Sequence, residues 1–313
     1  MIYISELIGT KHPIIQGGMG NISHPSLAIA VSEAGGLGTI GAGTMDPSIV
    51  EDMIQKIKAN TSKPFAVNLP ISVHPECKKI IDLIISYQVP VVTLSAGNPT
   101  PFIDVLKRNG CIVMCVVANE KQAKKAEKQG ADLIIAEGYE AAGINSSEEL
   151  TTFTLIPKIT SSVSIPVIAA GGIGDGRGLL AAMALGASGV QLGTRLIATK
   201  EAQVHSSYKE ALLTATSLDT IIVGRTHNKI RRVLKTPYTR ELAKKEATLT
   251  RAEYDELTDE IHHTRSAIEG NLNEGHLNAG QVASMIQDIP SVKELLERML
   301  EEARQIYREN FPL

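Results

Sequence analysis

The chain has no tryptophan, and aromatic residues make up only 4% of its 313 residues. Proteins that bind single-stranded nucleic acid without sequence preference stack bases on aromatic side chains, so this shortage argues against that class. The charge balance agrees, because a formal net charge of −3 gives no general attraction to nucleic acid or to anionic membranes. We therefore expect a small-molecule substrate, with neither nucleic acid nor a membrane as partner.

Cysteine is scarce as well, with three residues in the chain, Cys77, Cys111 and Cys115. Cys111 and Cys115 are four residues apart on an expected strand, which separates them by about 13 Å, too far for a disulfide. We interpret them as small buried hydrophobic residues. The cysteines and histidines also lack the spacing of a zinc site, so we expect no metal.

Long apolar runs are missing too. No stretch of 18 apolar residues occurs, so no transmembrane helix is expected. The segment from Met1 to Leu7 also lacks the basic and apolar parts of a secretory signal. These two absences lead us to expect a cytoplasmic protein.

What the sequence does contain is a regular alternation of strand and helix patterns. Apolar runs recur at intervals of about 20–30 residues and are continuous, as in parallel strands covered on both faces. They are residues 13–16, 37–40, 65–69, 91–94, 112–117, 133–136, 166–170 and 189–192. Helical periodicity and helix end signals lie between them, at residues 47–57, 76–87, 101–109, 120–129 and 178–185 among others. The alternation predicts a (β/α)8 TIM barrel, and an open doubly wound sheet comes second.

The pattern changes after residue 200. Residues 201–289 are polar and show helical patches at 201–216, 240–254 and 259–268. We predict a helical excursion after strand eight that covers the C-terminal face, and it would serve as a lid, as a helical cap or as the surface of a homodimer. Residues 290–311 then predict a terminal helix. The expected division is a barrel over 1–200, a helical cap or lid over 201–289 and a terminal segment over 290–313 that returns to the barrel.

Glycine follows the last two predicted strands of the barrel. Gly171 and Gly172 come directly after the seventh, and Gly193 and Thr194 come directly after the eighth. Bare backbone N–H groups at the ends of two neighbouring parallel strands form a cradle for a phosphate. In TIM barrels, phosphate sites are commonly built in these two loops.

The other strand ends carry glycines and amides instead of charged catalytic pairs. The first strand ends in Gln16-Gly17-Gly18-Met19-Gly20, the third ends near Asn68, and Gln191 lies in the eighth. A site lined by Gln16, Asn68, Gln191 and backbone N–H groups suits an aromatic cofactor that supplies its own chemistry.

Several of these motifs together resemble the nitronate monooxygenase family, which also includes the flavin-dependent enoyl-acyl-carrier-protein reductases II. The motifs are Ile14-Ile-Gln-Gly-Gly-Met-Gly, Ala34-Gly-Gly-Leu-Gly, Ala136-Glu-Gly, Ala169-Ala-Gly-Gly-Ile-Gly-Asp-Gly and Val190-Gln-Leu-Gly-Thr-Arg. The resemblance runs from about residue 5 to residue 200, with a further match at Asn278-Ala-Gly-Gln-Val-Ala.

The resemblance implies a TIM barrel that binds FMN. Carried over residue by residue, it places the phosphate end of FMN at Gly171, Gly172, Gln191, Gly193 and Thr194. It places the ring and the ribityl chain against Gly17, Gly18, Met19, Asn68 and Glu137.

The chain departs from the family on the loop after strand six. Family members usually carry a histidine after Glu-Ala-Ala-Gly, whereas here Glu140-Ala-Ala-Gly is followed by Ile144. Isoleucine can neither accept nor donate a proton. Three explanations are open: His74 or His227 takes the role, the substrate is an already deprotonated nitronate, or the proton comes from water. We interpret the other histidines, including the pair at 262 and 263, as surface or structural residues.

A basic cluster lies within the excursion, formed by Arg225, Lys229, Arg231, Arg232 and Lys235. One interpretation is the solvated face of a helix. The other is a docking site for an anion, either the 2′-phosphate of NADPH or an acidic acyl carrier protein.

These observations lead us to expect an FMN-dependent oxidoreductase that resembles nitronate monooxygenase and oxidises alkyl nitronates with dioxygen. The first alternative is an NAD(P)H-dependent reductase of enoyl thioesters, for which acyl carrier protein would be a partner. The second is a flavin-binding protein with little catalysis, because the usual histidine is Ile144.

Overall fold

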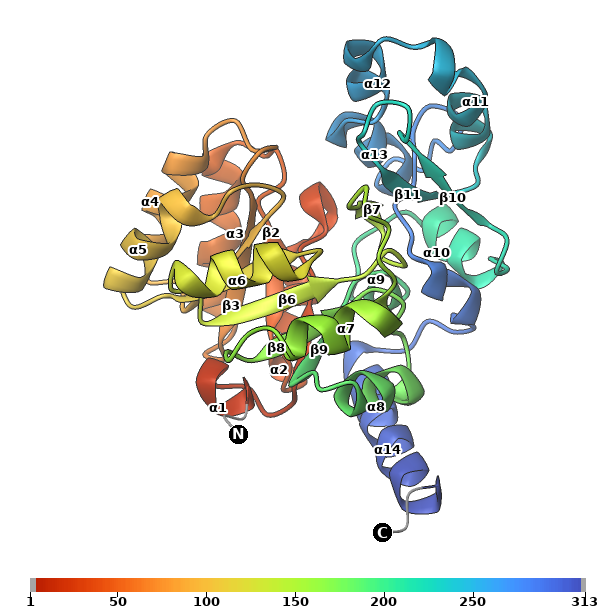
Figure 1. Cartoon of the computed structure of the whole chain (residues 1–313). Coiled ribbons are helices and arrows are strands. Elements are labelled where there is room, and N and C mark those ends of the chain that lie inside the picture. Colours follow the sequence, from red (N-terminus) through yellow and green to blue (C-terminus); the bar gives the residue numbers. More distant parts are fainter. Residues whose placement is uncertain (1–3, 311–313) are drawn as a thin grey trace.

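The computed structural model describes residues 4–310. Its main sheet has 8 parallel strands in the order β1-β9-β8-β6-β5-β4-β3-β2. The two outer strands meet at a parallel bridge between Ile15 and Leu37, where Gln16 N donates to Leu37 O at 2.9 Å. The chain is therefore a TIM barrel, as predicted (Figure 1). Its strands are β1 (Ile14–Gln16), β2 (Gly38–Gly41), β3 (Phe65–Pro70), β4 (Val91–Ser95), β5 (Ile112–Val117), β6 (Leu133–Glu137), β8 (Val167–Ala170) and β9 (Gly189–Leu192).

Two hydrophobic layers explain why the strand sequences are continuously apolar. One layer fills the barrel, with Ile15, Met114 and Ile168 among its members, and Ile4 and Ile8 of α1 (Ile4–Ile8) belong to the same cluster. The second layer lies between the strands and the surrounding helices. Six of the eight strands contribute to both layers, whereas β2 and β9 contribute only to the outer one, so most strand positions on either face are apolar.

The barrel helices begin where the sequence carries helix start signals. Asp46 accepts from Ser48 N ahead of α3, Asn119 accepts from Gln122 N ahead of α6, and Asp175 accepts from Gly178 N ahead of α8. The helices are α2 (Pro25–Glu33), α3 (Pro47–Asn60), α4 (Cys77–Ser86), α5 (Thr100–Arg108), α6 (Glu120–Lys128), α7 (Thr152–Thr160), α8 (Gly176–Ala184) and the short α9 (Thr194–Ile197).

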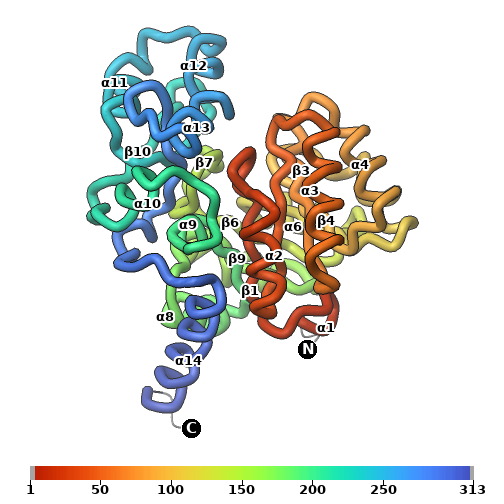
Figure 2. The backbone as a smooth tube through the Cα atoms, turned by 180° about the vertical axis from the view of Figure 1, so that it is seen from behind, coloured from red at the N-terminus to blue at the C-terminus, as the bar shows by residue number. Residues whose placement is uncertain are grey.

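The terminal helix α14 (Val292–Asn310) packs on the outside of the barrel against α8 and α2 (Figures 1 and 2). Val292, Leu295, Leu296 and Met299 are its buried residues. Residue 311 of the predicted helix lies outside the described residues. The helix thus occupies the position in the outer ring between the last barrel helix and the first.

The segment between barrel and terminal helix is not purely helical, which corrects the expectation for residues 201–289. It contains the antiparallel strands β10 (Thr220–Val223) and β11 (Arg231–Leu234), and β11 also pairs with β7 (Gly143–Ile144) from the loop after β6. The strand β11 was not predicted, because its two adjacent arginines are typical of a solvent-exposed segment. The helices of the segment are α10 (Ser206–Leu213), α11 (Pro237–Lys245), α12 (Arg251–Leu257) and α13 (Glu260–Ala267), with short 3-10 turns η2 (Glu246–Thr248) and η3 (Gln281–Met285). We call residues 201–289 the cap.

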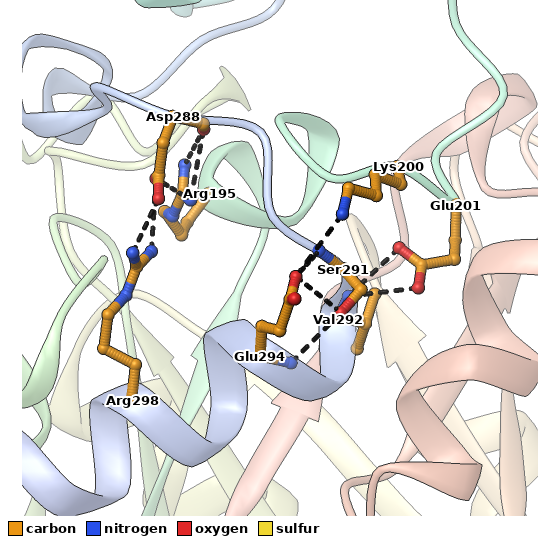
Figure 3. A network of polar contacts seen from close by, with 8 residues as sticks. All are labelled: Arg195, Lys200, Glu201, Asp288, Ser291, Val292, Glu294 and Arg298. Atoms are coloured by element: carbon orange, nitrogen blue, oxygen red, sulfur yellow. Dashed lines mark hydrogen bonds and ion pairs between the residues drawn. The ribbon is translucent and has the colours of Figure 1, made fainter.

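The cap leaves and re-enters the barrel at neighbouring points, which polar contacts hold together (Figure 3). Arg195 Nη2 donates to Asp288 Oδ1 at 2.8 Å, and Arg298 Nη1 of α14 donates to Asp288 Oδ2 at 2.6 Å. Nearby, Val292 N donates to the Glu201 carboxylate at 3.0 Å. These contacts fix both ends of the cap to the barrel.

Candidate active site

A cavity of about 560 Å³ lies at the carboxyl ends of the strands, beneath the cap. Ligand sites of TIM barrels occupy this face of the fold, and the volume is within the usual range for small-molecule sites. Ten of the eleven residues predicted for the cofactor line it: Gly17, Gly18, Met19, Asn68, Glu137, Gly171, Gly172, Gln191, Gly193 and Thr194.

The loops after β8 and β9 present free backbone donors to this cavity. Within the described residues, the N–H groups of Gly172 and Gly193 donate to no acceptor. Gly171 and Gly172 have φ values of 97° and 74°, which side-chain-bearing residues rarely adopt. A Cβ added at Gly193 would meet nothing within 4 Å, so the space beside it belongs to the cavity. This concave backbone surface, which we call the cradle, suits a phosphate.

The turn after β1 lies against two polar side chains of the barrel. A Cβ at Gly18 would be 2.3 Å from Asn68 Cβ, so only glycine fits there. Asn68 is held by Ser95, whose Oγ is 3.1 Å from Asn68 Nδ2. The amide of Gln191 makes no hydrogen bond with the described residues and faces Gly17. Backbone and amides therefore form one wall of the cavity next to the cradle.

Glu137 ends β6 on the floor of the cavity. Its carboxyl group has no hydrogen-bond partner among residues 4–310, and burial raises its pKa to about 7. A carboxyl group placed this way is ready to accept hydrogen bonds from the hydroxyl groups of a ligand. Its neighbour Glu140 is occupied instead, because it accepts from Thr152 N at 2.9 Å at the start of α7.

Three predicted residues are not brought to the cavity. Gln16 is fully buried behind it, where Nε2 donates to Ser23 Oγ at 3.0 Å and Oε1 accepts from Thr39 N at 3.3 Å. His74 uses both ring nitrogens on backbone groups, Met45 O at 3.1 Å and the N–H of residue 76 at 3.0 Å. His227 stacks on Tyr254 in the cap. Neither histidine is among the residues lining the cavity.

Ile144 does line the cavity, and it is 46% exposed. The strand β7 pairs it with Arg231 of β11, whose side chain also lines the cavity. The cap contributes further lining residues that the sequence did not identify as site residues: Glu260, His263, Asn278, Gly280 and Val282. The family motif beginning at Asn278 was the one signal for any of them.

The basic cluster is split by the structure, which corrects its interpretation as a helix face. Arg231 and Arg232 lie on β11 and are 8% and 4% exposed. Arg225 and Lys229 are more exposed and pair with Glu149 and Asp255. The two β11 arginines therefore cannot form part of an open basic surface for a protein partner.

The described residues hold neither a metal cluster nor a membrane span. Within residues 4–310, no group of three or more histidine, cysteine, aspartate or glutamate side chains could bind a metal ion. In the same range, no helix combines the length and apolar character needed to cross a membrane.

The fold and this cavity define a TIM barrel with a concave backbone cradle after its last two strands. Comparison with known proteins identifies the family. The nitronate monooxygenase family model matches residues 2–79 and 75–302. The chain belongs to the nitronate monooxygenase family, and it is an oxidoreductase of the flavoprotein type that this family comprises.

Individual relatives differ in the reactions after which they are named. A (3aS,4S,5R,7aS)-5-hydroxy-7a-methyl-1-oxo-octahydro-1H-indene-4-carboxyl-CoA dehydrogenase of Rhodococcus jostii is 32% identical, covering 96% of this chain and 95% of that protein. A probable nitronate monooxygenase of Staphylococcus aureus is 30% identical, covering 97% of each chain. The solved structure of FabK from Thermotoga maritima is 42% identical with a TM-score of 0.94, covering 98% of this chain and 97% of that one.

Proposed function

We propose that this protein binds FMN and reduces the carbon–carbon double bond of an enoyl thioester with electrons from NAD(P)H. The alkene gains two electrons and two protons, and NAD(P)H becomes NAD(P)⁺. When bound, FMN would supply the electron transfer between the two substrates. The proposal departs from our first sequence-based expectation, nitronate oxidation, which becomes the second candidate.

The residues present fit FMN. The free N–H groups of Gly172 and Gly193 would bind its phosphate, and Thr194 Oγ1, which accepts from Gly280 N at 2.9 Å, keeps its own hydrogen to donate. The unpartnered carboxyl group of Glu137 would accept from ribityl hydroxyls. The Gly17-Gly18 backbone with Asn68 would support the flat ring.

The extent of the cavity is the observation that carries the thioester assignment. Besides the residues of the cradle and the ring wall, the cavity is lined by Ile144 and Arg231 and by three exposed residues, Asn98, Gln122 and Lys125, which we call its rim. An acyl thioester has a reacting end and a long carrier arm, so it needs both an inner pocket and an open rim. A small nitronate would fill only the inner part.

Two relatives support the same substrate class. The Rhodococcus protein is named for a carboxyl-CoA, which is an acyl thioester. FabK is an enoyl-acyl-carrier-protein reductase II, and it shares 42% of residues over nearly the whole chain. The exposed rim is compatible with coenzyme A and with acyl carrier protein, because both present the thioester on a similar arm.

Nitronate oxidation has one specific observation in its favour. Ile144 cannot act as a base, and an alkyl nitronate is already deprotonated, so its oxidation needs no base from the enzyme. The 30% identity to a probable nitronate monooxygenase is consistent with this reaction.

Anaerobic stopped-flow spectroscopy of the purified protein, loaded with FMN, separates these reactions. We expect NADH or NADPH to bleach the flavin absorbance, and trans-2-hexenoyl-CoA to restore it without oxygen. Bleaching by propyl-2-nitronate alone, with no response to either nicotinamide, would replace the proposal by nitronate oxidation. A flavin that no donor bleaches faster than free FMN would indicate a binding protein with little catalysis.

A further inference from the structure

We propose that Arg231 binds the thioester carbonyl oxygen of the substrate, the atom on which negative charge develops during reduction. This inference rests on the proposed function, because it assigns a role at that site. It also explains how the cavity could support the reaction with Ile144 at the position where the family usually carries a histidine.

The strand pairing places Arg231 at this part of the cavity. Register in the small sheet sets Arg231 opposite Ile144, and Asn278 bridges to Val233 further along the same edge of β11, since β10 occupies the other edge. The Arg231 side chain lines the cavity and is only 8% exposed. Arg231, a residue of the cap, therefore lies beside the loop that follows β6.

The guanidinium of Arg231 is only partly bonded. Nη1 donates to Asn278 Oδ1 at 3.2 Å and lies 3.3 Å from His276 Nε2. Its Nε and Nη2 atoms have no acceptor, and no carboxylate forms an ion pair with it, within residues 4–310. A buried charge without a counterion is unfavourable unless a ligand supplies one.

The other two arginines of comparable burial differ in this respect. Arg195 is paired with Asp288 at 2.8 Å. Arg232 donates from Nε and Nη2 to Tyr139 O at 3.1 and 2.9 Å, and its guanidinium lies 4.8 Å from the centre of the Tyr139 ring. These two have structural partners, whereas the free donors of Arg231 remain for a ligand in the cavity.

One buried histidine, His276, contacts Arg231, and a second, His263, packs against His276. Burial and the nearby Arg231 lower the pKa of His276 well below its ordinary value, so its ring is neutral and Nε2 can accept from Nη1. His263 stacks on His276 with ring centres 5.3 Å apart, and its Nδ1 lies 3.0 Å from His276 O. His276 thus helps to orient the guanidinium, and burial, which lowers the pKa of both histidines, disfavours a positive charge on either ring.

The chemistry of an enoyl thioester matches this arrangement. When a hydride adds to the β-carbon, the electron pair of the double bond moves toward the carbonyl oxygen, and a proton then adds to the α-carbon. The electrons come from NAD(P)H, as proposed above, and water supplies the proton. A preorganised cation at the oxygen stabilises this charge, and losing one such donor typically lowers kcat by about 10²–10³-fold.

Arg231→Met, Arg231→Lys and a control, Lys229→Met, test the inference in the flavin-loaded protein. Lys229 is a cation of the same hairpin that pairs with Asp255 outside the cavity. With trans-2-hexenoyl-CoA, we expect Arg231→Met to lower kcat/KM at least about 100-fold, mainly through kcat, and Arg231→Lys to restore part of it. Lys229→Met should stay within twofold of wild type. FMN affinity should change less than threefold in all variants, and the melting temperature of Arg231→Met should equal or exceed that of wild type.

Binding of hexanoate, followed by the flavin spectrum, gives a readout that needs no turnover. We expect wild type to bind this carboxylate and Arg231→Met to bind it at least tenfold more weakly. If wild type turns over no thioester but hexanoate binding depends on Arg231, the proposed reaction fails and Arg231 remains the anion-binding residue. Unchanged turnover and hexanoate binding in Arg231→Met would overturn the inference. So would a loss of FMN affinity as large as the loss of activity, since Arg231 would then hold the cofactor.

Discussion

Ile144 and Glu137 both line the cavity and flank one short loop after β6. Ile144 gives the cavity an apolar side chain at the position where the resemblance to the family led us to expect an imidazole. Glu137 gives it a carboxyl group with no partner in the described chain. The first determines where the proton can come from, and the second is suited to hold the cofactor.

Introducing an imidazole at the loop tests the first of these roles. In Ile144→His we expect kcat/KM to become pH-dependent, with an apparent pKa below about 6.5, because Arg231 lies opposite on β11 and disfavours imidazolium. Steady-state rates across pH 5–9 measure this. Ile144→Asn is the control for polarity without titration, and a profile for Ile144→His that coincides with wild type would contradict a catalytic role for this position.

The raised pKa of Glu137 predicts how the stability of the flavin-free protein depends on pH. Its pKa rises from the ordinary 4.5 to about 7, so the folded state binds a proton more tightly than the unfolded state. Stability should therefore fall as the pH rises from about 4.5 through 7, by roughly 3 kcal/mol at most. Glu137→Gln should remove this dependence and be the more stable form at pH 8. Chemical denaturation at a series of pH values measures it, and parallel curves for both proteins would show that the carboxyl group is not perturbed.

At the scale of elements, the attachment of the cap depends on Asp288. This carboxylate joins Arg195, which is only 4% exposed, to Arg298 of α14. In Asp288→Ala, Arg195 would keep only the backbone carbonyl of residue 288, to which it donates at 3.2 Å. We expect a loss of about 2–3 kcal/mol in the free energy of unfolding, because a buried charge would lose its counterion.

The pH dependence of this contact has a defined direction. Hydrogen bonds from Arg298, followed by the charges of Arg298 and Arg195, hold the pKa of Asp288 below its ordinary 3.8. The stabilisation is therefore present at neutral pH and disappears only as the pH falls below about 4. As a control, Glu297→Ala removes an exposed carboxylate from α14, the helix that carries Arg298, and should change the free energy of unfolding by less than about 0.5 kcal/mol. An equal effect of both substitutions would show that Asp288 is no more than a surface charge.

The barrel elements were predictable because their signals are local. The parallel strands are covered on both faces and are therefore mainly apolar, and capping residues such as Asp46 and Asn119 mark the helices. The strand β11 was missed because Arg231 and Arg232 resemble surface residues, and their burial depends on partners from distant segments. β7 has only two residues and exists only through its pairing with β11.

The sequence could predict which barrel residues line the cavity, but it could not predict those that the cap contributes. Glycines after strands must leave the backbone bare wherever they occur, so the cradle was visible in the sequence. His263 and His276 have no such signal, because their burial arises from their stacking on one another and from the cap around them. Gln16 was misplaced because its position at a strand end is the same whether it faces the cavity or the barrel helices.

For the whole molecule, the barrel supplies the cradle and the cap closes the cavity above it. Methyl substitution at a glycine distinguishes a ligand site from a structural turn. A Cβ at Gly193 meets nothing in the chain, so Gly193→Ala should leave the fold intact while placing a methyl group in the cradle. Gly178→Ala on α8, outside the cavity, is the matched control and should retain full FMN affinity.

Comparing the dissociation constants of FMN and riboflavin for the flavin-stripped protein tests the central claim most directly, since the two ligands differ only in the phosphate. With two or more charge-assisted hydrogen bonds to that phosphate, FMN should bind about 10²–10³-fold more tightly than riboflavin. Gly193→Ala should abolish most of this difference, and Gly178→Ala should preserve it. Equal affinity of the wild-type protein for FMN and riboflavin would contradict the cradle, and with it the FMN-dependent reaction proposed for this cavity.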